Sequence, residues 1–331
     1  MRERIGRLGL MALTTGLLTA MGAPGPATAQ EKGVWRHGII EAKSDSGLIY
    51  MASKRGFGEK EGIRIEILQI KSDAIGLKAL LAGELDSFEG APGGAIVAAA
   101  RGADVKIVGC AWPQLVHGIF VNASIGRAED LKGKTFAISA PGAMPDLLAR
   151  AALEQHGVAG ADVQFANLGS DLDRYKALSA GVVQGAVVST EYLPLANKDI
   201  KMLFAARDVM PNFVRGCVMT TGKTLTTRQD EAVRFVTAEI KGLRYAVTHK
   251  DEAVSLTREI TEAKPDDPRP GFIFDEVVKH GDVDPDMKIP QGKLSWLQDL
   301  LVKTGSVEKP IDIAKMIDPG VRDKALARVG Q

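Results

Sequence analysis

Hydrophobic and polar residues follow the same order in two stretches of the chain. The stretch IRIEILQIKSDAIGLKALLAG starts at Ile63, and ADVQFANLGSDLDRYKALSAG starts at Ala161, at an offset of 98 positions without a gap. Each opens with apolar residues at alternate positions, which predicts a β-strand. The repetition indicates that one supersecondary unit occurs twice, and it predicts two similar α/β lobes.

The second half of each repeat predicts a capped helix. Ser72 and Ser170 stand where a helix begins, and an aspartate follows each of them. Serine is a preferred N-cap, and acidic residues are favourable in the first helical turn. Gly83 and Gly181 stand where these helices end, and glycine is favoured there because it adopts a left-handed conformation readily. The residues after each glycine predict a second strand and its exit loop.

The remaining segments follow the same α/β order. Residues 34–43 predict the first strand, and SDSGLIYMASKRG predicts a helix capped by Ser44, Asp45 or Ser46. After residue 221 the apolar residues recur with a helical period over a long segment, and again over residues 291–305. These C-terminal helices are expected to pack on the first lobe, so that this lobe is built from two separate segments of chain.

The first residues predict a secretory signal peptide. Three arginines precede an apolar run from Leu8 to Met21, and the small residues Ala27, Thr28 and Ala29 follow. Cleavage is expected after Ala29, which makes residues 1–29 the signal peptide. The apolar run is short for a membrane-spanning helix.

Composition and charge are those of an ordinary globular protein. The 331 residues are 45% hydrophobic and 25% charged, and the formal net charge is +1. Loss of the signal peptide removes three arginines and one glutamate, which leaves a charge near −1. Such a balance favours neither nucleic acid nor a membrane surface as a partner. Cys110 and Cys217 are the two cysteines; they either form a disulfide in an oxidising compartment or stay as buried thiols.

Several segments resemble one family of proteins. The order SDSGLIYMASKRGFGEKEGIRIEI, KALLAGELD, GAPGGAIVAAARGADVKIVG, EDLKGKTFAIS and KALSAG is similar to the nitrate, sulfonate and taurine type of ABC-importer solute-binding protein, a group that includes relatives of thiamine-pyrimidine binders. The resemblance covers residues 34–227. It implies a two-lobed α/β fold of the type II periplasmic-binding class, with two crossover strands and a ligand in the cleft between the lobes.

The crossovers can then be placed on the sequence. Residues 116–124 are expected to leave the first lobe, and residues 213–221 are expected to return to it. Lobe 1 is therefore predicted as residues 30–123 and 216–331, and lobe 2 as residues 124–215.

Four loops are the candidate ligand site. Ligands of open α/β sheets bind outside the carboxyl ends of the strands, where loops deliver helix starts. The repeat places these loops at residues 43–47, 90–93, 139–144 and 189–192, and aromatic or basic residues flank the predicted crossovers. The candidate ligand-binding residues are Lys43, Ser44, Asp45, Ser46, Gly90, Ala91, Pro92, Gly93, Trp112, His117, Ser139, Pro141, Gly142, Ala143, Ser189, Thr190, Glu191, Tyr192, Phe213 and Arg215.

The charge of the ligand depends on two acids. Helix starts and the basic residues Lys43 and Arg215 favour a small anion, such as a sulfonate or a carboxylate. This holds if Asp45 and Glu191 cap their own helices. If these two acids face the cavity instead, the ligand is expected to carry an amine or a ring N–H group.

Catalytic and metal-binding motifs are absent from the sequence. It contains no HExxH, GxSxG or P-loop motif, and neither cysteine has a neighbour at metal-ligand spacing. We therefore expect no enzyme activity, no cofactor and no metal. We expect a monomeric periplasmic protein that binds a small molecule and delivers it to an ABC permease in the inner membrane. The alternatives are an enzyme on the same fold, related to thiamine-pyrimidine synthesis, and a co-receptor that senses a solute.

Overall fold

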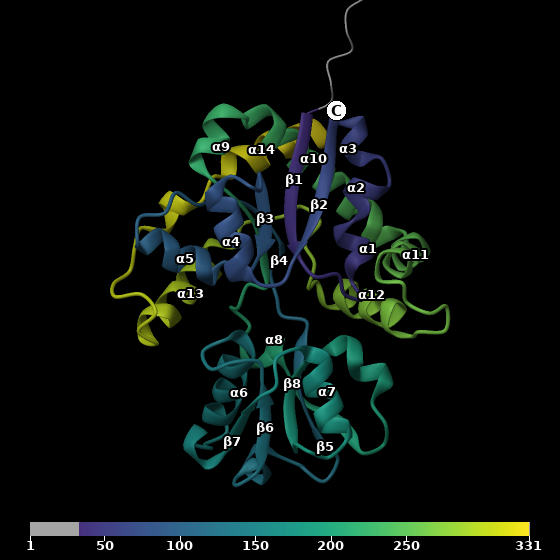
Figure 1. Ribbon diagram of the computed structural model, residues 1–331, viewed down its shortest axis with the longest axis vertical. Coiled ribbons are helices and arrows are strands. Elements are labelled where there is room, and N and C mark those ends of the chain that lie inside the picture. The colour runs from purple at the N-terminus through teal and green to yellow at the C-terminus, as the bar shows by residue number, and fades with distance from the viewer. Residues whose placement is uncertain (1–32, 331) are drawn as a thin grey trace, which may run out of the picture. The chain divides into compact units, whose positions relative to one another are not determined.

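A computed structural model describes residues 33–330 of the chain, and the predicted signal peptide lies outside the described residues. Within residues 33–330 the strands form two five-stranded sheets. Figure 1 shows the purple and blue strands together with the green and yellow C-terminal helices in one lobe, and the teal elements in the other. The predicted two-lobed α/β architecture is confirmed.

The first sheet has the strand order β2-β1-β3-β10-β4. Strand β1 pairs in parallel with β2 and β3, whereas β10 runs antiparallel to β3 and β4. The strands are β1 (Gly33–Ile40), β2 (Ile63–Ile70), β3 (Ser87–Gly90), β4 (Lys106–Trp112) and β10 (Gly216–Thr220).

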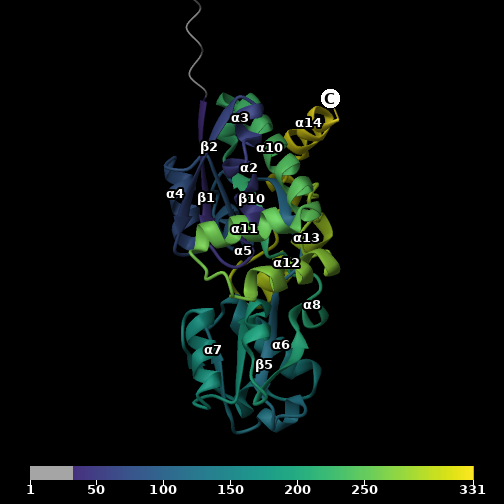
Figure 2. The same ribbon diagram turned by 90° about the vertical axis from the view of Figure 1, so that its right-hand side faces the viewer.

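Helices from both ends of the chain cover the first sheet. The long helix α10 contacts α1, α2, α3 and α14, and Figure 2 shows it beside α2. The helices of this lobe are α1 (Ser46–Ile49), α2 (Met51–Lys54), α3 (Phe57–Lys60), α4 (Asp73–Ala82), α5 (Gly93–Ala100), α9 (Gly222–Thr227), α10 (Gln229–Thr248), α11 (Lys250–Thr261), α12 (Arg269–His280), α13 (Gln291–Lys303), η4 (Ile313–Met316) and α14 (Pro319–Val329).

The second sheet has the strand order β7-β6-β8-β5-β9. Its strands are β5 (His117–Asn122), β6 (Thr135–Ile138), β7 (Gln164–Asn167), β8 (Gly185–Ser189) and β9 (Ile200–Ala205). Its helices are η1 (Ala128–Leu131), α6 (Met144–Gln155), η2 (Gly160–Asp162), α7 (Asp171–Ser179), η3 (Thr190–Leu195) and α8 (Ala206–Val209).

The two copies of the repeat fold in the same way. The side chains of Ser72 and Ser170 cap α4 and α7, and Gly83 and Gly181 are left-handed, with φ of 78° and 70°. The equivalent aspartates also make equivalent bonds: the backbone N–H of Ala91 donates to Asp73 Oδ1, and that of Ser189 donates to Asp171 Oδ1. The donors Ala91 and Ser189 are again 98 residues apart. The repeat therefore includes the hydrogen bonds at the carboxyl ends of β3 and β8.

Two sequence expectations differ from the structure. Residues 117–122 were placed in the first lobe, but β5 pairs with β8 and β9 of the second sheet. Nearly all of β5 is buried, so its sequence pattern does not indicate which sheet it joins. The helix expected after Ser44 is divided into the short helices α1 and α2, and Asp45 at its start makes no side-chain cap bond.

Cys110 and Cys217 form a disulfide between β4 and β10. Of the two states that the sequence left open, the structure therefore contains the bridged one. Across residues 33–330, no helix combines the length and apolar character needed to cross a membrane.

Candidate functional site

A cavity of about 480 Å³ lies at the carboxyl ends of strands from both sheets. The first sheet contributes the residues that follow β1, β2 and β3, and the second sheet contributes those that follow β6 and β7. An adjoining hollow of about 780 Å³ shares Lys43 and Asp171 with this cavity and extends over η3 and the residues between α11 and α12.

The structure brings thirteen of the twenty predicted site residues to these two hollows. Ten line the smaller cavity: Lys43, Asp45, Gly90, Ala91, Trp112, His117, Ser139, Ala143, Phe213 and Arg215. The adjoining hollow is lined by Lys43 again and by three more: Ser44, Glu191 and Tyr192.

The other seven predicted residues line neither hollow. Ser46 Oγ accepts a hydrogen bond from the Lys43 backbone, and the hydroxyls of Ser189 and Thr190 donate to the Val116 carbonyl. Ser46 therefore stabilises its own loop, whereas Ser189 and Thr190 join the end of β8 to the residue just before β5. The full set outside the hollows is Ser46, Pro92, Gly93, Pro141, Gly142, Ser189 and Thr190.

A close helix contact holds the first of these loops. The Gly47 N–H donates to Thr257 Oγ1 at 2.8 Å. A Cβ atom at Gly47 would lie 1.8 Å from the carbonyl oxygen of Ala253, so only glycine lets α1 dock on α11 here. This docking places Lys43 and Asp45 at the cavity and Ser44 at the adjoining hollow.

Arg215 is the basic centre of the first-sheet side of the cavity. Its Nη2 lies 2.6 Å from Asp45 Oδ2, and its guanidinium carbon lies 4.3 Å from the centre of the Trp112 ring. Its backbone N–H donates to the Trp112 carbonyl. Two buried atoms of this pair, Arg215 Nη1 and Asp45 Oδ1, have no hydrogen-bond partner within residues 33–330. The pair therefore offers a ligand one donor and one acceptor.

Asp171 is the centre of the charged cluster on the opposite side. Its carboxylate lies 2.9 Å from Lys43 Nζ, 2.5 Å from Arg174 Nη2 and 3.7 Å from His117 Nε2. Burial opposes ionisation of Asp171. Lys43, His117 and Arg174 outweigh this effect and hold the pKa of Asp171 well below its ordinary value. Because Lys43 belongs to the first lobe, this ion pair joins the two lobes.

His117 lies beside Asp171, and its Nδ1 atom makes no hydrogen bond within residues 33–330. Burial lowers the pKa of His117, and the nearby Asp171 carboxylate opposes that shift. Its Nδ1 is buried and has no partner among the described residues. Such an atom, on a side chain that lines the cavity, is available for a hydrogen bond to a ligand.

Buried carboxyl groups lie behind the Arg215 pair. Glu89 lines the cavity, and burial raises its pKa to about 7 although Arg215 opposes the shift. Glu239 of α10 is buried further from the cavity, and burial, assisted by Glu89, raises its pKa well above the ordinary value. Both carboxyl groups therefore keep their protons to a higher pH than exposed carboxyl groups do.

Neither Asp45 nor Glu191 caps its own helix. The carboxylate of Asp45 binds Arg215, and Glu191 Oε2 accepts a hydrogen bond from the Ser44 backbone at 3.1 Å. Burial raises the pKa of Glu191, and the bond from Ser44 opposes that shift. The sequence favoured an anionic ligand only if Asp45 and Glu191 capped their own helices. The structure does not meet this condition, because Asp45 faces the cavity. Its charge is instead matched by Arg215.

Sequence reasoning missed several residues that line the cavity. Asp73 and Asp171 were interpreted only as first-turn acids, and Glu89 only as the end of a strand. A usable signal was present, since both aspartates recur at the repeat offset and directly follow the loops that leave β2 and β7. The other lining residues that were not predicted are Ile39, Ile40, Glu41, Ile49, Lys71, Ser72, Leu115, Met144, Pro145, Gly169, Ser170, Arg174 and Gly216.

No metal centre is found in the part of the chain that the structure describes. Within residues 33–330 there is no group of three or more His, Cys, Asp or Glu side chains arranged to hold a metal ion.

The fold and the sequence have named relatives. Residues 43–253 match the model of the family described as NMT1/THI5 like. A Bacillus subtilis (strain 168) protein assigned to the binding of aliphatic sulfonates is 26% identical over 326 residues, which are 94% of this chain and 93% of that protein.

Solved structures share the fold at lower identity. The periplasmic aliphatic sulphonate binding protein SsuA from Escherichia coli superimposes with a TM-score of 0.71 at 19% identity, over 86% of this chain and 92% of that chain. The desulfurization enzyme DSZB superimposes with a TM-score of 0.67 at 14% identity, over 89% of this chain and 99% of that chain. The fold therefore occurs in both binding proteins and enzymes.

Proposed function

Because the chain belongs to the NMT1/THI5-like family, we propose that it is the solute-binding protein of an ABC importer and that it binds a small organic anion, such as a sulfonate or a carboxylate, between its lobes. It is exported to the periplasm as a monomer and delivers its ligand to a permease in the inner membrane. The matched Bacillus subtilis protein, assigned to aliphatic sulfonates, supports this class of ligand.

The observation that carries the proposal is the guanidinium of Arg215, whose side chain is 19% exposed and lines the interlobe cavity. Its Nη1 donor is buried without a partner among the described residues, and the Arg215 side chain lines a cavity of a size that suits a small ligand. A guanidinium binds sulfonates and carboxylates through charge-assisted hydrogen bonds, which are stronger than neutral ones. Arg215 therefore binds the acidic head group.

Apolar side chains provide the space for the rest of the ligand. Trp112, Leu115 and Phe213 line the same cavity as Arg215, and all three are buried. Burial of an alkyl or aryl group against such side chains contributes about 25 cal/mol per Å² of apolar surface. The ligand is accordingly an organic anion and not a bare inorganic one.

One observation favours a second class of ligand. Asp45 Oδ1 is buried at the cavity and accepts no hydrogen bond within residues 33–330. A ligand with an amine or a ring N–H group would satisfy this oxygen. The two classes differ in whether binding depends on the positive charge of Arg215.

Ligand-dependent thermal unfolding of the mature protein separates the classes. Screening compares alkanesulfonates, aliphatic and aromatic carboxylates, nitrate and pyrimidines. We expect sulfonates or organic carboxylates to raise the midpoint of unfolding, because a ligand that binds only the folded state stabilises it by mass action. Stabilisation by cationic or neutral heterocycles alone, undiminished in Arg215→Ala, would show that the anion proposal is wrong.

The role that we propose is binding without catalysis. Both cysteines are joined in the disulfide, so neither supplies a nucleophilic thiol. Purified mature protein is expected to release its ligand unchanged. A chemically altered product after incubation with a bound sulfonate or sulfinate would instead favour an enzyme like the desulfurization enzyme that shares the fold.

A further inference from the structure

The disulfide lies at the two points where the chain leaves and re-enters the first sheet. Cys110 belongs to β4, after which the chain enters the second sheet at β5. Cys217 belongs to β10, which is the first strand after the return from β9. The bond joins residues 107 apart and closes a loop that contains every strand of the second sheet.

The same bond lies next to the proposed ligand-binding pair. Cys110 is two residues before Trp112, and Cys217 is two residues after Arg215. The backbone N–H of Arg215 donates to the Trp112 carbonyl at 3.0 Å, and the guanidinium lies over the indole ring. Any change in how β4 and β10 lie against each other therefore moves the two side chains that line the cavity.

Backbone pairing between β10 and β4 is irregular, whereas the pairing between β10 and β3 has no register shift. The register between β10 and β4 shifts between Gly216 and Val218, and again between Val218 and Met219. A register shift interrupts the regular ladder of hydrogen bonds between two strands. Cys217 is the residue at the first shift, so the disulfide supplies a restraint where the ladder lacks one.

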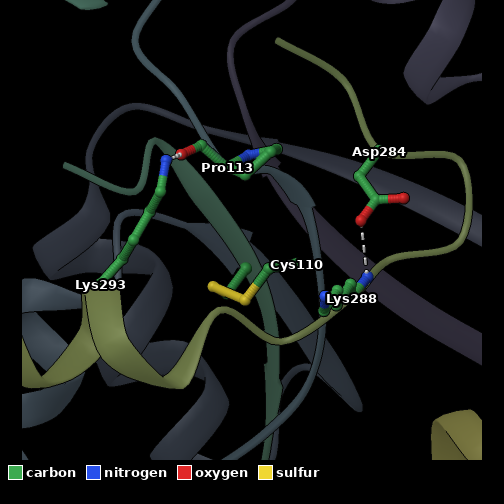
Figure 3. Close-up of a disulfide and its surroundings, with 6 residues drawn as sticks. Cys110, Pro113, Asp284, Lys288 and Lys293 are labelled. Carbon is green, nitrogen blue, oxygen red and sulfur yellow. Dashed lines mark hydrogen bonds between the residues drawn. A yellow bond between two sulfur atoms is a disulfide. The ribbon is translucent and has the colours of Figure 1, made fainter. Parts of the chain in front are cut away.

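Other contacts hold the β4 side of the pair, and the opposite edge of β10 pairs with β3, where Cys217 lies opposite Gly90. The Cys110 N–H donates to the Met287 carbonyl, and Lys293 Nζ of α13 donates to the Pro113 carbonyl at 2.9 Å, directly after β4. Figure 3 shows Lys293 reaching Pro113 on one side of the disulfide and the segment with Asp284 and Lys288 on the other. The start of β10 is tied to this anchored strand through the disulfide and through Arg215.

The geometry points to the Cys110–Cys217 disulfide as the element that positions Trp112 and Arg215 for ligand binding. It fixes the departing and returning segments to one another, so that movement of the second lobe is confined to the chain between β4 and β5 and between β9 and β10. This inference rests on the proposed function, because it assigns the bond a role at that same ligand site.

The test compares the oxidised mature protein with the Cys110→Ser/Cys217→Ser variant. Binding of 1-butanesulfonate is titrated at a temperature at which both proteins are folded. We expect the dissociation constant to rise at least about ten-fold, and amide hydrogen exchange to become faster in residues 112–116 and 210–217. A Leu131→Ala variant, which removes a buried side chain of the second lobe away from the cavity lining, is expected to lose stability without this change in affinity.

The outcomes separate positioning from plain stabilisation. If the double variant unfolds at a lower temperature but binds within two-fold of the wild type, the inference is wrong and the bond only stabilises the fold. If the serine variant does not fold, Cys110→Ala/Cys217→Val, which keeps the buried positions apolar, is measured in the same way. If the wild type does not bind 1-butanesulfonate, the proposed ligand class fails separately, and unchanged exchange in the two segments then counts against the disulfide role.

Discussion

Replacement of Arg215 by alanine is expected to weaken binding of an organic sulfonate or carboxylate about 100-fold. Charge-assisted hydrogen bonds contribute about 1.5–3 kcal/mol each, and removal of Arg215 also leaves Asp45 as an unpaired negative charge beside the incoming anion. Removal of one partner of a buried charge pair lowers binding affinity strongly, because the other charge is left without a partner. Calorimetric titration of wild type and variant measures the ratio of the dissociation constants.

Two further variants control for folding and for charge. Asp45→Asn/Arg215→Ala removes the unpaired acid and is expected to remain weak, because the donor is still missing. Arg215→Lys keeps the charge but loses the planar fork, and it is expected to lie between wild type and alanine. Arg127→Ala, on a side chain that is 74% exposed, serves as the matched arginine control. Wild-type affinity in the double variant would contradict the role given to Arg215.

The second large effect concerns pH and Glu89. Burial raises the pKa of Glu89 from 4.5 to about 7. Between these values the folded protein holds a proton that the unfolded chain has released, so the free energy of unfolding falls as the pH rises through this window. A shift of this size corresponds to about 3 kcal/mol.

Glu89→Gln is therefore expected to flatten the pH dependence of stability. Glutamine stays neutral at all these pH values. Between pH 4.5 and pH 8 the free energy of unfolding of the variant is therefore expected to fall by about 3 kcal/mol less than that of the wild type. Urea unfolding at several pH values measures the difference, and Glu154→Gln on an exposed position is the control. Parallel curves for wild type and Glu89→Gln would show that Glu89 does not carry the proton. Glu239 remains in both proteins, and its pKa shift contributes to both curves.

Local patterns predicted the fold because they recur at a fixed offset. The alternating strands, the serine caps at Ser72 and Ser170 and the terminal glycines are all decided by neighbouring residues, and the structure contains each of them. The placement of β5 could not be read in this way. A strand that is buried over nearly its whole length shows no alternation, and its sheet is decided by partners far away in the sequence.

The sequence predicted cavity-lining residues that lie at strand ends, but not the ion pairs between distant residues. The rule that ligands lie beyond the carboxyl ends of strands located Asp45, Gly90 and Ser139. The ion pairs of Lys43 with Asp171 and of Arg215 with Asp45 join residues more than 100 positions apart, and no local pattern indicates them. The disulfide was left undecided for the same reason, since its two cysteines become neighbours only when β10 returns beside β4.

The position of the bound ligand tests the proposed role of Arg215 most directly. A crystal of the mature protein with a bromoalkanesulfonate, examined by the anomalous scattering of bromine and sulfur, locates the ligand directly. We expect the sulfonate within hydrogen-bonding distance of Arg215 Nη1 and the alkyl chain against Trp112 and Phe213. Ligand density only outside the cavity between the two sheets, or a sulfonate in the cavity turned away from Arg215, would contradict the account.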